Sequence, residues 1–302
     1  MDLVIVIAKA VSGYAIPFVL FTVMGLILQG RKAVQWSAGL LASVRTNLAL
    51  ALAGGVMAPV LTLSVVGVRA GYDALSLPQA PMEFWQACPP WLAVLAWLVA
   101  IDFIDYWNHR LLHSGPFWPV HAVHHSDPDM NWTTSYRVHV LELCIMQISY
   151  ILLASWMNLP AEGLGFVVGA RLLHNNWVHT RYDLSLGWLD RVIATPRYHH
   201  WHHADDPAAY NTNFGNTFAI WDVIFGTYRV PGRYTGTFGF EESPGNDILK
   251  LVILPFHAWI QALLKLARKP EQKKNKLLTQ RSSVDTSDRA ATVALKGDML
   301  AT

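Results

Sequence analysis

Long apolar runs alternate with short polar segments along the first 180 residues. The run from Leu3 to Leu28 holds one charge, Lys9, and the run from Asn47 to Val68 holds none. Each is long enough to cross about 30 Å of hydrocarbon as a helix. Further runs cover residues 91–107 and 140–159, and we interpret all four as membrane spans.

A fifth apolar run, residues 164–178, is shorter and carries Arg171 and His174. It is therefore expected to return through protein rather than to face lipid. The first run follows Met1-Asp2, which has no positive charge, and it exceeds a typical signal-peptide core. We interpret it as a retained span.

Composition supports a membrane protein. Hydrophobic residues make up 53% of the chain and charged residues 15%, against about 25% charged residues in an ordinary soluble domain. The sequence therefore predicts an all-α integral membrane bundle of about four to five spans with a histidine-rich helical cap. The net charge of +2 carries no nucleic-acid signal, and the two cysteines are too few for an iron–sulfur cluster or a zinc ribbon.

The chain divides into four predicted regions. Residues 1–84 hold two spans, residues 85–231 hold the chemistry, residues 246–268 form an amphipathic interfacial helix, and residues 269–302 form a disordered polar tail. The predicted first loop contains Arg31, Lys32 and Arg45. The positive-inside rule then puts this loop, and every histidine box, on the cytoplasmic side.

Six of the thirteen histidines form two copies of the pattern HxxHH, at residues 121–125 and 199–203, and a HRLLH box covers residues 109–113. Positions three and four apart share a helix face, so each box can aim two or three imidazoles at one point. Eight such histidines are too many for one zinc ion. They would serve two metals with four or five ligands each, and nitrogen ligands suit iron, copper or zinc.

Carboxylates accompany the boxes. Asp102 and Asp105 precede His109 by seven and four residues, which puts all three on one helix face. A carboxylate that accepts the spare N–H of a ligating histidine would fix its tautomer. The alternative for both aspartates is a solvated helix end.

Six segments carry a resemblance to a known family: DYWNHRLLH (105–113), HAVHH (121–125), YRVHVLE (136–142), RLLHNNWVHTRYD (171–183), TPRYHHWHH (195–203) and NFGNTFAIWDVIFGTYRVP (213–231). Their order and spacing resemble the fatty acid hydroxylase/sterol desaturase superfamily. The resemblance covers about residues 100–231. It implies a membrane-bound non-haem di-iron enzyme that hydroxylates or desaturates a sterol, a fatty acyl chain or a related lipid.

The resemblance also implies the site residues. The implied metal ligands are His109, His113, His121, His124, His125, His179, His199, His202 and His203. His139 is a weaker candidate because valine follows it where the family often has proline. His174 either binds the metal or lies behind the ligands, and His200 lies behind the ligands. Asp222 joins Asp102 and Asp105 as a candidate behind the ligands, with helix capping as its alternative.

Two iron ions (Fe2+/Fe3+), dioxygen and two electrons follow from the same resemblance. No haem-binding CxxCH and no GxGxxG is present, so the electrons are expected from a separate reductase or carrier. It would dock on a basic cytoplasmic face that includes Arg110, Arg181, Arg191 and Arg197. A bacterial inner membrane is favoured over the endoplasmic reticulum because no retention signal ends the chain. A histidine-rich metal transporter and a metal-stabilised scaffold remain the alternatives.

Overall fold

The computed structural model describes residues 3–158 and 164–268. It divides into two compact units, one that ends at Leu254 and one that begins at Pro255. The first unit contains every histidine box. The described part of the second unit, residues 255–268, is helical.

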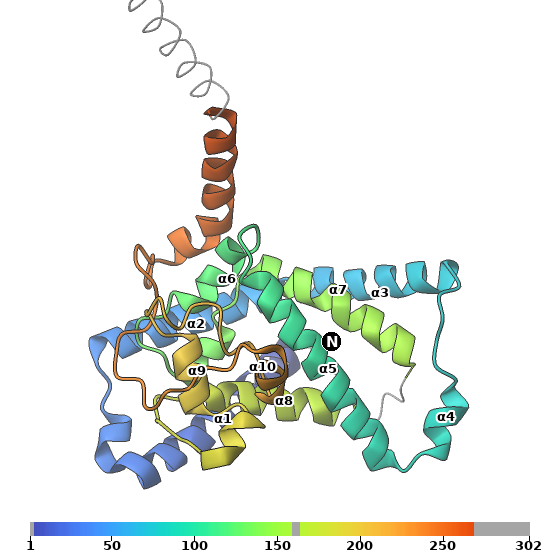
Figure 1. Ribbon diagram of the computed structural model, residues 1–302, viewed down its shortest axis with the longest axis horizontal. Helices are drawn as coiled ribbons and strands as arrows, with labels where there is room; N and C mark the ends of the chain where they lie inside the picture. The colour runs from blue at the N-terminus through green and yellow to red at the C-terminus, as the bar shows by residue number, and fades with distance from the viewer. Residues whose placement is uncertain (1–2, 159–163, 269–302) are drawn as a thin grey trace, which may run out of the picture. The chain divides into compact units, whose positions relative to one another are not determined.

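The first unit is built from α-helices and short 3-10 helices (Figure 1). The α-helices are α1 (Leu3–Gln29), α2 (Ala38–Val56), α3 (Ala58–Ala74), α4 (Met82–Ala87), α5 (Pro90–Leu112), α6 (Trp118–His125), α7 (Val140–Met157), α8 (Leu164–Val178), α9 (Pro196–His202) and α10 (Ile220–Phe225). The 3-10 helices are Gly30–Val34, Trp132–Tyr136 and Gly187–Arg191. In the described part of the chain, extended pairing is limited to an isolated bridge between Ala204 and Phe238. The predicted all-α fold is confirmed.

Among the described residues, five helices are long and apolar enough to cross a membrane: Ala15–Val34, Ala38–Val56, Pro90–Leu112, Val140–Met157 and Ile248–Arg268. Large apolar side chains such as Ile27, Val56 and Leu63 are exposed along the helices of the first unit. Exposed apolar side chains of this kind suit contact with hydrocarbon. The predicted number of spans is therefore confirmed.

The predicted span from Asn47 to Val68 is wrong, because the chain breaks at Met57 between α2 and α3. Pro59 explains the break, since it has no N–H and its ring clashes with the carbonyl four residues earlier. The candidate span is Ala38–Val56 instead. Arg45 consequently lies inside α2 and not in a loop, so the predicted orientation rests on Arg31 and Lys32 and stays a prediction.

The predicted interfacial helix over residues 246–268 corresponds to a helix from Ile248 to Arg268, which also has the length and composition of a span. Its placement in the membrane surface stays a prediction. The predicted polar tail, residues 269–302, lies outside the described residues, as does Leu159 at the end of the fourth predicted span.

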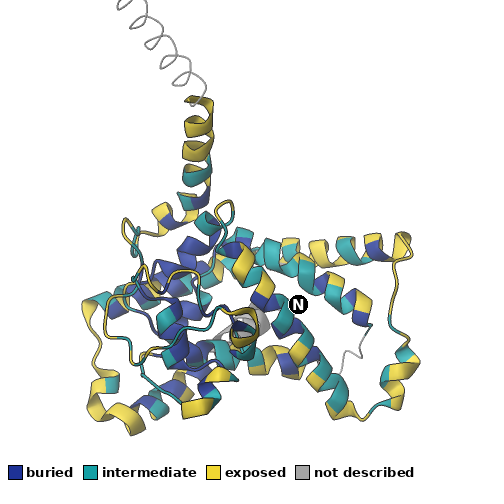
Figure 2. Ribbon diagram, in the orientation of Figure 1, coloured by how far each residue is buried: buried dark blue, intermediate teal, exposed yellow. Residues whose placement is uncertain are grey.

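The core of the first unit places α5, α7 and α8 around the site. Trp97 and Ile101 of α5 pack with Met157 of α7 and Val167 of α8. Helix α8 contacts α5 and α9, but Phe166, Val168 and Leu172 are exposed. Its return through protein therefore stays a prediction. Figure 2 shows that buried residues gather where α6 and α9 approach the end of α5, while exposed residues follow α1, α3 and α4.

Local sequence sets where the helices of the site begin. Thr195 caps α9 by accepting a hydrogen bond from Tyr198 N, and Pro196 occupies the first helical turn, where a missing N–H costs nothing. Tyr198 is fully buried with Val178 and Ala219. This packing holds the face of α9 that carries the histidines toward α6.

Candidate metal centre

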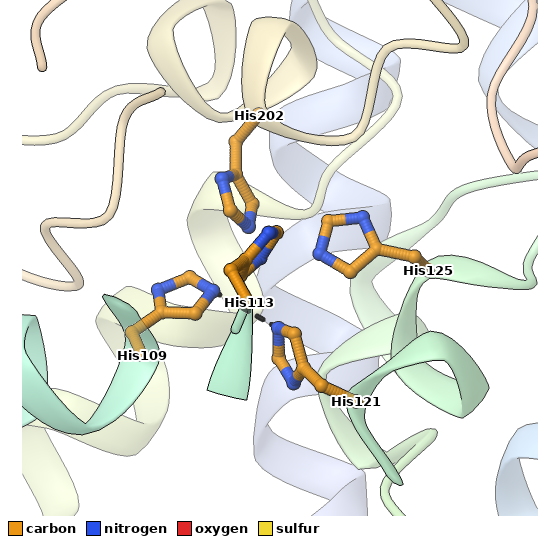
Figure 3. A group of neighbouring side chains, drawn as sticks. All are labelled: His109, His113, His121, His125 and His202. Carbon is orange, nitrogen blue, oxygen red and sulfur yellow. Dashed lines mark hydrogen bonds between the residues drawn. The ribbon is translucent and has the colours of Figure 1, made fainter. Parts of the chain in front are cut away.

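Five histidine side chains from three helices converge on one point, which we call the five-histidine group. His109 lies in the last turn of α5 and His113 at its C-cap, His121 and His125 lie one turn apart on α6, and His202 lies on α9. One ligand atom from each lies within 4.8 Å of all the others. Figure 3 shows the rings arriving from different sides of a common centre.

A second group, the four-histidine group, contains His124, His179, His199 and His203, all buried, whose ligand atoms also lie within 4.8 Å of one another. The Nε2 atom of His179 lies 3.1 Å from Nε2 of His124 and 2.9 Å from Nε2 of His199. His199 and His203 approach to 3.1 Å through the same atoms. The ring nitrogens of this group therefore face one another.

Each HxxHH box divides between the two groups. On α6 the first and last histidines join the five-histidine group and the middle one joins the four-histidine group, whereas the α9 box is divided the opposite way. The rings of His125 and His203, one from each group, stack with centroids 4.4 Å apart. The groups are therefore adjacent. Their sizes match the expectation of two metals with four or five ligands each.

Backbone carbonyls orient three of the nine rings through Nδ1. The pairs are His109 with Phe214 O at 2.8 Å, His202 with Thr212 O at 2.9 Å and His179 with Asn175 O at 2.6 Å. A carbonyl only accepts, so Nδ1 carries the proton and Nε2 presents its lone pair. This is the arrangement that fixes the tautomer of a metal-binding histidine.

Several ring nitrogens in the five-histidine group have no protein partner. The Nε2 atoms of His113, His125 and His202 are buried without a hydrogen bond to any described residue. Buried nitrogens of this kind normally have partners, and a cation among their lone pairs would supply one. An all-imidazole donor set suits iron, copper or zinc better than magnesium or calcium. The residues therefore fit a pair of transition-metal ions.

The electrostatics favour the neutral form of the rings. Burial lowers the pKa of His199, His202 and His203 well below the ordinary value near 6.5, and neighbouring imidazoles lower it further. Burial lowers the pKa of His179 to about 4, although the Asn175 carbonyl acts in the opposite direction. Neutral imidazole is the form that binds a metal.

The carboxylates bind a loop instead of the histidine rings. Asp102 accepts hydrogen bonds from Thr217 N at 2.8 Å, Phe218 N at 3.0 Å and Trp221 Nε1 at 3.0 Å. Asp105 accepts from Asn216 Nδ2 at 3.1 Å. The spare N–H of His109 is bound by the Phe214 carbonyl of the same loop, where we expected one of these carboxylates.

Asp222 holds the same loop from the other side. It accepts from Phe214 N at 2.8 Å, Gly215 N at 2.7 Å, Tyr198 Oη at 2.5 Å and Thr227 Oγ1 at 2.6 Å. The loop over residues 213–218 is thus fastened by three buried carboxylates. Its conformation presents the Phe214 carbonyl to His109.

Glu142 is a functional candidate that sequence reasoning missed. Its Oε1 atom lies 3.0 Å from Nδ1 of His121, and both side chains are buried. The carboxyl group of Glu142 therefore faces Nδ1 of a candidate ligand, on the side of the ring opposite Nε2. An ionisable residue alone in an apolar run is a signal that could have found it.

His139, His174 and His200 lie outside both groups, as does His257. His139 caps α7, where Nδ1 accepts from Leu141 N at 3.1 Å and Nε2 lies 3.1 Å from Val252 O. His174 lies on α8 and joins neither group. His200 lies 2.8 Å from Thr180 O through Nε2. The geometry thus supports nine of the eleven proposed ligands. It also supports a position behind the ligands for His200.

A cavity of about 520 Å³ reaches both histidine groups. His109 and His121 line it from one group, and His124, His179 and His199 line it from the other. Its apolar wall comes from α3, α7 and α8: Leu61, Leu143, Met146, Val168 and Leu172. An elongated apolar molecule in this cavity would therefore lie against both candidate metal sites.

Comparison with known proteins agrees with this geometry. Residues 94–227 match the family described as fatty acid hydroxylase. An alkylglycerol monooxygenase of Xenopus tropicalis is 31% identical over 177 residues, which cover 58% of this chain and 37% of the relative. The ornithine lipid hydroxylase OlsE of Rhizobium tropici is 30% identical over 220 residues, which cover 68% of this chain and 61% of the relative.

A methylsterol monooxygenase of Gallus gallus is 30% identical over 151 residues, which cover 47% of this chain and 49% of the relative. The chain spans about a third of the length of the alkylglycerol monooxygenases. No solved structure matches. The matched residues contain all nine grouped histidines, and this part of the chain, residues 94–227, is a fatty acid hydroxylase domain.

Proposed function

We propose that this chain is a membrane-bound non-haem di-iron oxygenase that hydroxylates a C–H bond of a lipid. The observation that carries the proposal is the pair of adjacent all-histidine groups that open onto one cavity. The relatives are named for the oxygenation of alkylglycerols, an ornithine lipid and a methylsterol. These names favour hydroxylation over desaturation.

Two iron ions in these groups would supply the activation of dioxygen with two electrons, so that one oxygen atom enters the C–H bond and the other leaves as water. The protein's part is to orient and to exclude water. The carbonyls of Phe214, Thr212 and Asn175 hold three rings in position, and Glu142 faces a fourth. The apolar wall of the cavity would hold the lipid chain beside both groups.

The electrons would come from a separate protein that docks near the histidine groups on the cytoplasmic side. Of the four arginines expected to attract it, Arg197 is already bound to Asp183 by two hydrogen bonds of 2.9 and 2.8 Å. Arg110 and Arg191 lie over the rings of Trp107 and Tyr228 and form no ion pair with an acidic side chain among the described residues. These two and Arg181 would carry the attraction.

The two alternatives fit the geometry less well. A metal transporter needs ionisable residues along a path through the spans, whereas the grouped histidines come from the end of α5, from α6 and α9 and from the residue after α8. A scaffold stabilised by metal has no use for a cavity of about 520 Å³ lined by five of its candidate ligands. An oxygenase requires both features.

Iron content tests the proposal. We expect the purified protein to hold about two iron ions per chain and to form a hydroxylated lipid when dioxygen and a reductant are supplied. His199→Ala should lose iron and activity. His200→Ala is a matched control on the same helix, because its ring is buried but hydrogen-bonds Thr180 O. Equal iron in both variants, or tightly bound zinc without iron in the wild type, would contradict the proposal.

A further inference from the structure

The cavity beside the histidine groups contains polar atoms that have no partner. Gln147 Oε1, Arg171 Nε and Glu142 Oε2 are buried without a hydrogen bond to any described residue, and all three residues line the cavity. The side chain of Glu142 is only 5% exposed. Native proteins leave few such atoms unpaired, so we expect a ligand in the cavity to pair with at least one donor and one acceptor among the three.

The contacts around each atom define its chemistry. Gln147 Nε2 donates to Leu61 O at 3.1 Å. The amide oxygen therefore remains as an acceptor without a partner among the described residues. Arg171 forms an ion pair with Asp105 through Nη2, so Nε–H remains as a donor. Glu142 faces His121 through Oε1, so Oε2 remains as an acceptor.

This combination selects among lipids. A bare alkyl chain would leave the donor and the two acceptors dehydrated and unpaired. A carboxylate or phosphate head group has no hydrogen to donate to Gln147, and its oxygens would meet the carboxyl oxygens of Glu142 and Asp105, which line the cavity. A hydroxyl group accepts one hydrogen bond and donates another, so it can pair with Arg171 and Gln147 together.

We propose that the cavity binds a neutral lipid through a free hydroxyl group, which accepts from Arg171 Nε and donates to Gln147 Oε1. The inference rests on the proposed function, since it names the substrate class of the same site. The cavity is also lined by His109 and His124, one from each group. The oxidised carbon would therefore lie within the same cavity as the hydroxyl group.

Binding without turnover tests this inference. The iron-loaded protein in detergent micelles, without a reductant, is titrated with tritiated hexadecan-1-ol, 1-methoxyhexadecane and hexadecanoate, which share one chain length. We expect the alcohol to bind about tenfold more tightly than the ether, the effect of one satisfied hydrogen bond. Hexadecanoate should bind more weakly than the alcohol.

Substitutions of Gln147 and Arg171 test whether the preference for the alcohol arises in the cavity. Gln147→Leu should bring the affinities for the alcohol and the ether close together, and Arg171→Lys should weaken alcohol binding while it keeps a positive charge beside Asp105. Gln147→Glu keeps an acceptor and should retain the preference, which separates loss of the hydrogen bond from loss of folding. Gln79→Leu, outside the cavity on an exposed side chain, is the matched control and should bind like the wild type.

Equal affinities for the three probes in the wild type would overturn the inference. A preference that survives in both Gln147→Leu and Arg171→Lys would also overturn it. Iron content and product formation are measured separately. A protein that hydroxylates lipid but shows no alcohol preference refutes the inference and keeps the proposed function, and the reverse result refutes only the proposed function.

Discussion

The Nδ1 atom of His109 lies 2.8 Å from the carbonyl oxygen of Phe214, a residue 105 positions later in the chain. The carbonyl fixes the tautomer of the ring and turns Nε2 toward the other histidines. Asp222 holds the Phe214 N–H at 2.8 Å. The orientation of a candidate ligand therefore depends on a carboxylate that binds the loop and not the ring.

We expect Asp222→Asn to destabilise the protein and to lower its iron content. The amide group would present N–H where Phe214 N, Gly215 N and two hydroxyl groups now donate, and each buried donor left unpaired costs about 1–3 kcal/mol. Thermal unfolding and elemental analysis measure the two effects. Asp73→Asn, at a largely exposed aspartate, is the control, and equal losses in both variants would contradict the expectation.

Glu142→Gln should weaken iron binding without unfolding the protein. The change keeps the shape of the side chain but replaces the carboxyl group that faces Nδ1 of His121 at 3.0 Å with an amide. Loss of such an outer partner typically lowers metal affinity about 10–100-fold. Competition with an iron chelator measures the change. Glu83→Gln on α4, at an exposed position, should bind iron like the wild type.

The two histidine groups should respond differently to the loss of one ring. His199→Ala leaves three imidazoles in its group, whereas His202→Ala leaves four. We therefore expect His199→Ala to lose about one iron per chain, and His202→Ala to retain more iron at saturation with a weaker affinity. Mössbauer spectra of each variant report which iron is lost. Identical losses and spectra would show that the two groups are not separate metal sites.

His139→Asn should leave iron content unchanged. His139 caps α7 by accepting from Leu141 N, and asparagine is a favourable N-cap that can accept the same bond. A stability change of about 1 kcal/mol or less follows. Elemental analysis beside His199→Ala provides the comparison, and a clear loss of iron would make His139 a ligand after all.

Arg137→Ala should destabilise the protein more than the removal of an exposed charged side chain does. Arg137 is fully buried and donates to Ser126 Oγ at 2.8 Å and to Asn47 Oδ1 at 3.1 Å, near the buried Asp127. Removal of one member of a buried charge network costs about 3–5 kcal/mol.

Arg69→Ala is the comparison for this prediction. Arg69 and Asp73 form an ion pair whose side chains are 40% and 47% exposed, and such pairs contribute about 0–1 kcal/mol. Unfolding midpoints of both variants measure the difference, and similar midpoints would contradict the assigned role of Arg137.

His179 was identified only by the family resemblance, whereas the sequence by itself determined the all-α membrane architecture and the eight histidines of the three motifs. These features are local, because the length of an apolar run and the three- and four-residue spacing on a helix are readable without knowledge of long-range contacts. The break at Met57 was also readable from Pro59, and the lone charge of Glu142 was readable within its apolar run. Neither the break nor the role of Glu142 was predicted, because each depends on a single residue.

The tertiary structure alone decided how each HxxHH box divides between two groups, and which atoms hold the rings. His109 meets Phe214, and His121 meets Glu142, only because α5, α6, α7 and the loop over residues 213–218 pack together. Asp102 and Asp105 share a helix face with His109, yet they accept hydrogen bonds from the loop and not from the ring. Spacing along a helix defines a face, whereas the partner that covers this face is set by contacts between distant parts of the chain.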